Sequence, residues 1–293
     1  MKRCSGHSRH SLFFAIFVAI FVASQDSRAA ATAFTAEVTG KGPPMILIPG
    51  LASSGEVWQG TVAHFCGRRE CHVLTLAGFA GVPPLDTPLL PAAEKQIVDY
   101  IDAKRLDHPV IVGHSLGGFL ALRIAADHPD KVGRIVIVDS LPALGATQIP
   151  DITAEQLKGV AGRMRDAMQA RDADAFAASQ RQSIAGMVTA PADAERIAAW
   201  GRKSDRATVI DAMCELMATD LRGDLGRIRT PVLVLGSWAA YKAYAPRSAI
   251  EATFAAQYRN LPGATIELSD NGRHFLMYDD PQWMYDRMDK FLK

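Results

Sequence analysis

The sequence predicts an α/β fold, in which helices flank a mainly parallel central sheet and a helical cap is inserted between two strands. Short apolar runs alternate with helical patterns along most of the chain, which is typical of a parallel sheet covered on both faces. One stretch, residues 144–219, breaks this alternation and contains helical patterns alone. The length of 293 residues, 48% of them hydrophobic, suffices for one large core with a modest insertion.

Strands are expected where short runs rich in Val, Ile and Leu occur without strict polar alternation, as in strands buried on both faces. These runs are Met45–Ile48, His72–Leu76, Val110–Val112, Ile135–Val138, Val232–Leu235 and Thr265–Leu268. Two segments with apolar residues at helical spacing, Leu116–His128 and Trp283–Leu292, are expected to pack against the sheet. Each run alone is also compatible with a helix fragment, but together they indicate a sheet.

Residues 144–219 are interpreted as the cap, which divides the core into residues 31–143 and 220–293. One cap helix is expected to begin at the capping-box sequence Thr153-Ala154-Glu155-Gln156. The cap also carries flexible or aromatic side chains, which either line an apolar pocket or pack between helices. They are Met164, Met168, Phe176, Met187, Trp200, Met213 and Met217.

Residues 1–30 are interpreted as a signal peptide. Lys2, Arg3 and Arg9 precede the apolar run Leu12–Ala23, and small residues follow it. This run, roughly a dozen residues long, is short for a membrane span, which needs about 20. We therefore expect export to the periplasm or the extracellular space without stable membrane insertion of the mature chain. An uncleaved anchor is the alternative.

Export permits disulfides, and Cys66 and Cys71 are separated by a glycine-containing turn, so we predict a bridge between them. Two free thiols are the alternative. Cys214 is expected to be buried in a helix, and no spacing of cysteines and histidines is typical of a metal site. The formal net charge of +1 gives no electrostatic footprint for nucleic acid, so a small-molecule partner is favoured. The oligomeric state is not indicated.

A serine nucleophile is predicted within Val110-Ile111-Val112-Gly113-His114-Ser115-Leu116-Gly117-Gly118, between a buried strand and an amphipathic helix. A serine used in this way projects from a sharp turn, where crowding demands glycine two residues before and two after it. The turn also puts Ser115 at a helix N-terminus, where backbone donors favour developing negative charge.

Strand, turn and helix together resemble the α/β-hydrolase fold family, and the similarity extends from Met45 to Leu292 apart from the cap. The resemblance implies an oxyanion hole formed by the backbone N–H groups of Leu116 and Leu51. It also implies that His274, which lies after the last strand, is the general base, since an imidazole can take a proton from the serine and return it to the leaving group.

In this family an acidic residue orients the catalytic histidine, and here its position departs from the family pattern. Most relatives carry an aspartate shortly after the strand that corresponds to Val232–Leu235, where this chain has Gly236-Ser237-Trp238. Two aspartates preserve the order serine, acid, histidine. Asp139 follows the strand Ile135–Val138, a position used by pancreatic-lipase-like members, and is favoured; Asp220, where the cap rejoins the core, is the alternative. An unidentified acid or a Ser–His dyad also stays open.

The resemblance implies acyl transfer to water through an acyl-enzyme, without cofactor or metal. We expect a carboxylesterase for short or medium acyl esters, with Trp238 helping to shape the substrate pocket. A lactonase or thioesterase is the near alternative. A catalytically silent binding protein is a second one, because the usual aspartate is absent; the intact Ser115, Gly113, Gly117 and His274 favour an enzyme.

Overall fold

The computed structural model describes residues 1, 31–147, 149, 151–261 and 263–293. The predicted signal peptide, residues 1–30, lies outside the described residues except for Met1. In the described part of the chain, no helix combines the length and the apolar character needed to cross a membrane.

Within the described residues, seven strands form one sheet in the order β1-β3-β2-β4-β5-β6-β7. β1 is antiparallel to β3, and all other neighbours are parallel. The strands are β1 (Phe34–Thr39), β2 (Pro44–Ile48), β3 (Glu70–Leu76), β4 (Val110–His114), β5 (Arg134–Val138), β6 (Val232–Ser237) and β7 (Thr265–Ser269). The predicted fold class is confirmed.

β1 is a strand that the sequence analysis did not predict. It is largely exposed at the edge of the sheet, and its apolar residues Phe34, Ala36 and Val38 alternate with polar ones. Such alternation is typical of an antiparallel strand with one covered face, whereas the six predicted strands are continuous apolar runs. The six predicted runs all lie within β2–β7.

The core lies on both faces of the sheet, because alternate residues of each strand point to opposite sides. Ile46 and Ile48 of β2 pack in one hydrophobic cluster, whereas Met45 and Leu47 pack in the other. The first cluster includes residues of α2 (Leu89–Lys104), α3 (Leu116–Asp127) and α8 (Arg247–Gln257). The second includes residues of α1 (Gln59–Phe65), α9 (Leu276–Asp279) and α10 (Pro281–Phe291). Short 3₁₀ segments are η1 (Gly55–Trp58), η2 (Leu144–Ala146) and η3 (Leu225–Arg227).

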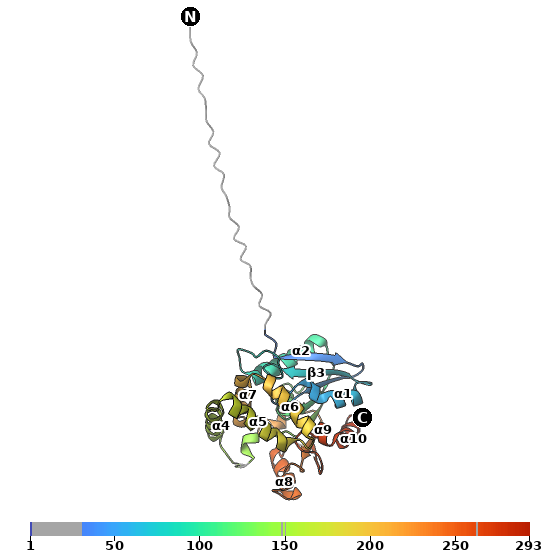
Figure 1. Ribbon diagram of the computed structural model, residues 1–293. Helices are drawn as coiled ribbons and strands as arrows, with labels where there is room; N and C mark the ends of the chain where they lie inside the picture. The colour runs from blue at the N-terminus through green and yellow to red at the C-terminus, as the bar shows by residue number, and fades with distance from the viewer. Residues whose placement is uncertain (2–30, 148, 150, 262) are drawn as a thin grey trace. The chain divides into compact units, whose positions relative to one another are not determined.

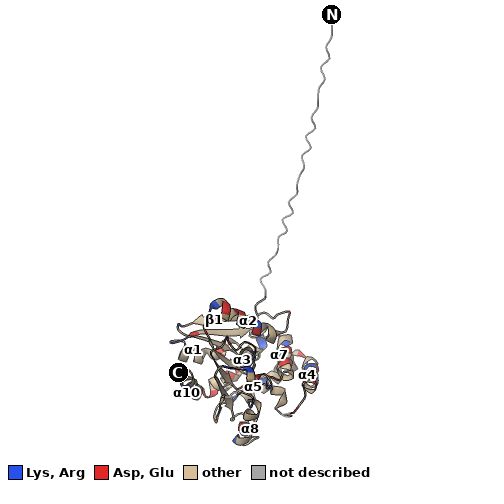
Figure 2. Cartoon of the chain, turned by 180° about the vertical axis from the view of Figure 1, so that it is seen from behind, with Lys and Arg blue, Asp and Glu red and all other residues tan. Residues whose placement is uncertain are grey.

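Four helices lie between β5 and β6 in the chain and form a group of neighbours (Figure 1). They are α4 (Ala154–Gln169), α5 (Ala173–Met187), α6 (Pro191–Lys203) and α7 (Arg206–Ala218). α4 packs against α7, and α5 packs against α6. α4 begins with a capping box, in which Thr153 Oγ1 accepts from the Gln156 N–H and Gln156 Oε1 accepts from the Thr153 N–H. Basic and acidic residues are interspersed on α2, α4 and α7 (Figure 2).

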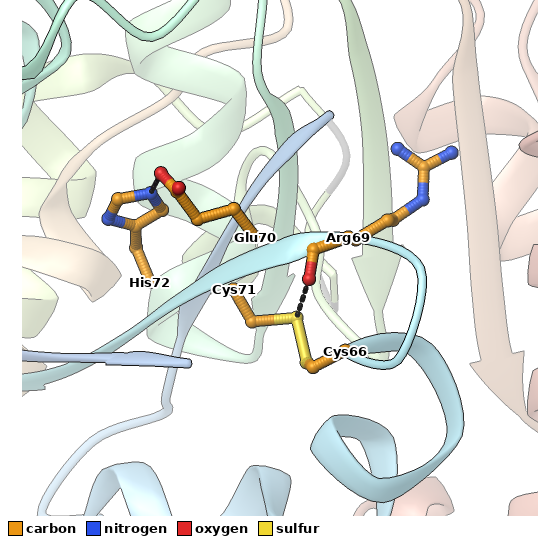
Figure 3. The surroundings of a disulfide bond; sticks show 5 residues. All are labelled: Cys66, Arg69, Glu70, Cys71 and His72. Carbon is orange, nitrogen blue, oxygen red and sulfur yellow. Dashed lines mark hydrogen bonds and ion pairs between the residues drawn. A yellow bond between two sulfur atoms is a disulfide. The ribbon is translucent and has the colours of Figure 1, made fainter. Parts of the chain in front are cut away.

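A disulfide joins Cys66, which ends α1, to Cys71 in β3, with their Cα atoms 5.7 Å apart (Figure 3). Both cysteines belong to the hydrophobic cluster beneath α1 and α10. Next to the bridge, buried His72 pairs through Nε2 with Glu70 at 2.9 Å. Cys214 is buried in α7, and this burial raises the pKa of its thiol.

Removal of the disulfide by the double substitution Cys66→Ser and Cys71→Ser is expected to lower the free energy of unfolding by about 2 kcal/mol, because a closed loop restricts the unfolded chain. Urea unfolding of both proteins measures the difference. Reductant serves as the control: it should destabilise the wild type by a similar amount and leave the double variant unchanged. A wild type whose unfolding is insensitive to reductant would contradict the prediction.

Candidate active site

Ser115 occupies the turn from β4 into α3 with backbone angles φ 52° and ψ −119°. Its N–H donates to the Val138 carbonyl of β5 at 3.0 Å. A Cβ at Gly113 would collide with the backbone carbonyl of Gly117, and one at Gly117 would collide with that of Ile48. The two glycines therefore allow a turn tight enough to put the Ser115 side chain at the carboxyl edge of the sheet.

Three other non-glycine residues that follow strands of the sheet also have positive φ. They are Ala52, four residues after β2, with φ 53°, Ala80, four residues after β3, with φ 48°, and Asp139, directly after β5, with φ 43°. Positive φ costs such residues of order 1–3 kcal/mol and persists only where surrounding contacts hold it, which is common at functional sites. Four neighbouring strands are thus each followed closely by a strained residue.

Asp139 and His274 form a hydrogen bond, 2.7 Å between Oδ2 and Nδ1. The other carboxylate oxygen of Asp139 accepts from the Ser237 N–H at 2.8 Å, so the end of β6 fixes the orientation of the carboxylate. The side chain of Asp139 is only 8% exposed, whereas that of His274 is 23% exposed. With Nδ1 donating to Asp139, the neutral imidazole has Nε2 as its proton acceptor.

Leu51 and Leu116, the residues predicted to form the oxyanion hole, both lie near Ser115. Leu116 is the first residue of α3, where a helix leaves its N–H groups without intrahelical acceptors. Leu51 follows Gly50, whose lack of a side chain permits a close approach: a Cβ there would lie 2.9 Å from His114 Nδ1 and 3.2 Å from the Ser115 Cβ. The backbone around Gly50 therefore approaches the serine closely, and α3 begins directly after it.

Ser115, Leu51 and His274 line one cavity of about 220 Å³. Cap residues form much of its lining. Its apolar cap lining consists of Met168, Phe176, Ile184, Met187, Ile197, Val209 and Met213, and its polar cap lining consists of Arg171, Ser179, Gln180 and Ser183. Of the predicted cap set, Met164, Trp200 and Met217 instead pack in the hydrophobic clusters. A larger hollow of about 660 Å³ lies between residues 84–89, α4 and α7. Its lining does not include Ser115, Leu51 or His274.

Residues 45–287 match the sequence profile described as the alpha/beta hydrolase family. The chain belongs to the alpha/beta hydrolase family. It is 26% identical over 206 residues to a pimeloyl-[acyl-carrier protein] methyl ester esterase of Nitrosomonas europaea, covering 68% of this chain and 78% of that protein. It is 25% identical over 259 residues to a Rhizobium rhizogenes protein named as a carbamate hydrolase, covering 85% and 92%. The enol-lactonase from Burkholderia xenovorans has the same fold, with a TM-score of 0.72, 16% identity and coverage of 88% and 96%.

Asp220, the alternative acid, pairs with Arg222 in this alpha/beta hydrolase. Its carboxylate accepts hydrogen bonds from the backbone N–H and the guanidinium of Arg222. Partial burial opposes ionisation, but the bonds from Arg222 outweigh it and hold the pKa of Asp220 below its ordinary value. The contacts of Asp220 are therefore those of an ion pair with Arg222, and Asp139 is the aspartate bonded to His274.

Trp238, the predicted pocket residue, is not part of the lining of the cavity that contains Ser115. Its ring lies near the cationic groups of Lys242 and Arg247, 5.1 and 5.9 Å from the ring centroid. Its Nε1–H donates to the Ala245 carbonyl at 3.3 Å. These contacts hold Trp238 within the segment after β6. They do not support the predicted role of Trp238 in shaping the substrate pocket.

Sequence reasoning missed His114 as a contact of the histidine loop. Buried at 1% exposure, it donates from Nε2 to the His274 carbonyl at 3.0 Å. Burial, with the neighbouring His274, lowers the pKa of His114 well below its ordinary value, so this ring is neutral. The position of His114 directly before Ser115 was a sequence signal that it lies near the site. Its orientation, however, depends on a loop 160 residues away in the chain.

The cap is attached to the His274 loop through the end of α5. The Phe275 N–H donates to the Met187 carbonyl at 3.2 Å. The Asp279 carboxylate accepts from Thr189 N–H at 2.9 Å, from Thr189 Oγ1 at 3.0 Å and from the Arg273 N–H at 3.0 Å. The loop that carries His274 is therefore bonded to both the core and the cap. In the described residues, no group of three His, Cys, Asp or Glu side chains is arranged to hold a metal ion.

Proposed function

We propose that this alpha/beta hydrolase is a serine esterase that cleaves carboxylic esters through an acyl-enzyme on Ser115. His274 is the general base and Asp139 is the third member of the triad. The proposal depends above all on the hydrogen bond between His274 Nδ1 and Asp139 Oδ2, 2.7 Å long, beside a serine held at a strained strand-to-helix turn. A base oriented by a carboxylate next to a nucleophile is the arrangement that acyl transfer requires.

In the first half of the reaction, Ser115 Oγ attacks the ester carbonyl carbon and its proton passes to His274 Nε2. The carbonyl oxygen becomes an oxyanion, which the N–H groups of Leu51 and Leu116 stabilise. The ester C–O bond then breaks, and His274 returns the proton to the departing alcohol. Asp139 accepts from Nδ1–H throughout and stabilises the imidazolium.

In the second half, His274 takes a proton from a water molecule, whose oxygen attacks the acyl-enzyme carbonyl. The Ser115 ester bond breaks, the proton returns to Ser115 Oγ, and the carboxylic acid leaves. The apolar cap lining of the cavity supports short or medium acyl chains. Relatives named as an esterase and a carbamate hydrolase support hydrolysis at a carbonyl carbon. A lactone or thioester is attacked by the same steps.

We further propose that the protein acts outside the cytoplasm, after removal of its signal peptide. The disulfide between Cys66 and Cys71 supports this location, because such bonds persist in oxidising compartments.

Labelling with a fluorophosphonate probe tests the nucleophile. The wild type is expected to be modified at Ser115, identified by peptide mass spectrometry, and to hydrolyse p-nitrophenyl esters, with lactones and thioesters in the same screen. Ser115→Ala should lose both labelling and turnover while keeping its circular dichroism spectrum. A wild-type protein that folds but stays unlabelled would favour a binding protein instead.

Substitution of each candidate acid tests the triad. Asp139→Asn is expected to reduce kcat by about 10⁴-fold, because the amide disfavours the required tautomer of His274. Asp220→Asn is the matched control and should retain most of the activity, since its carboxylate pairs with Arg222. Steady-state kinetics on one ester compare the two, and the reverse ranking would assign the acid to Asp220.

Asp279→Ala tests whether the bonds between cap and loop position His274. Loss of its three acceptor contacts is expected to lower kcat and the rate of probe labelling together, by about tenfold, with little change in KM. Asp286→Ala, at an exposed site on α10 bonded to Gln282, is the control. A lower melting temperature with unchanged kcat would mean that Asp279 serves stability alone.

A further inference from the structure

Helix α5 lays one face along the cavity that contains Ser115. The lining residues Phe176, Ser179, Gln180, Ser183, Ile184 and Met187 follow the three- and four-residue spacing of a helix face. Met187 is at the end bonded to the His274 loop, through its carbonyl and the Phe275 N–H. Ser179 lies roughly two helical turns, about 12 Å, before Met187. The face therefore runs from the histidine towards a polar far end.

The far end carries Arg171, whose Nη1–H donates to Ser179 Oγ at 2.7 Å. Arg206 fixes the turn between α4 and α5, because its guanidinium donates to the backbone carbonyls of Met168, Gln169 and Arg171. The same guanidinium lies 4.8 Å from the ring centroid of Phe176. The backbone carbonyl of Arg171 is thus bonded to Arg206, and its exposed guanidinium is bonded to Ser179.

The charge of the lining is one-sided. Among the described residues that line the cavity, Arg171 is the one permanently charged side chain, and no carboxylate is present. Asp172, its neighbour in the chain, is the N-cap of α5 and accepts from the Ala175 N–H at 2.7 Å. A guanidinium has five N–H donors in a planar fork that matches a carboxylate, and one of them goes to Ser179.

We infer, resting on the proposed esterase function, that the cavity selects esters that carry a second, anionic group several methylenes from the scissile carbonyl. Arg171 and Ser179 bind that group, in the simplest case a carboxylate, while the ester lies at Ser115. The apolar lining between them contacts the methylene chain. The span of about 12 Å along α5 sets the preferred length.

The experiment compares monomethyl esters of succinic, adipic, suberic and sebacic acids with the neutral dimethyl diesters, by initial rates at pH 7.5 corrected for two equivalent sites. At the preferred length, kcat/KM of the half-ester is expected to exceed that of the diester by about tenfold. Acetyl esters of ω-hydroxy acids form a second series, in which the carboxylate is on the alcohol side. A preference in either series supports the inference and identifies the side.

Arg171→Gln should abolish the preference by raising KM for the half-ester, whereas Arg171→Lys should keep part of it. Arg181→Gln, on α5 but outside the lining, is the matched control and should keep all of it. Diesters preferred at every length, or a preference that persists in Arg171→Gln, would overturn the subsite and leave the esterase proposal standing. If neither series is hydrolysed and Ser115 stays unlabelled, the esterase proposal fails and the subsite with it.

Discussion

The turn from β4 into α3 is the constraint on which the rest of the site depends. It holds Ser115 at φ 52°. The backbone can turn this tightly only because Gly113 and Gly117 leave room for the backbones of α3 and β2. The Ser115 N–H donates to Val138 of β5, so the turn is tied to the neighbouring strand as well. Three adjacent parallel strands, β2, β4 and β5, therefore fix the serine at their carboxyl edge. Side chains that act together with Ser115 must reach this edge.

The position of the acid follows from the same edge. β5 and β6 are neighbours in the sheet, so a carboxylate at the end of either strand lies close to the His274 loop. Here β6 ends in Ser237, whose backbone N–H donates to Asp139 at the end of β5. The end of β6 thus orients the carboxylate that the end of β5 supplies. Burial and the charge of Asp139 together raise the pKa of Tyr258 well above its ordinary value, so this phenol stays protonated beside the carboxylate.

Much of the fold was predictable because its strands are short buried runs and its serine turn has a local steric signature. β1 was missed because an exposed edge strand has an alternating pattern. The pairing of Asp139 with His274 could only be ranked, since the order of residues along the chain fits Asp220 equally well and the neighbourhood of strand ends is a property of the sheet. Trp238 was expected in the pocket for its aromatic character, but Lys242, Arg247 and Ala245 satisfy its ring and its N–H. The orientation of His114 depends on long-range contacts that no local pattern encodes.

The cap positions one wall of the cavity, because hydrogen bonds fix the chain at both ends of α5. Its C-terminal end is bonded to the His274 loop through Met187 and through Thr189 just beyond it, with Asp279 as the common acceptor. Its N-terminal end follows a turn whose carbonyls Arg206 holds. A helix fixed at both ends keeps a constant distance between its polar residues and the histidine. Substrate length is then set by a rigid element rather than by a mobile loop, and the bonds from Phe275 and Asp279 attach that element to the loop that carries His274.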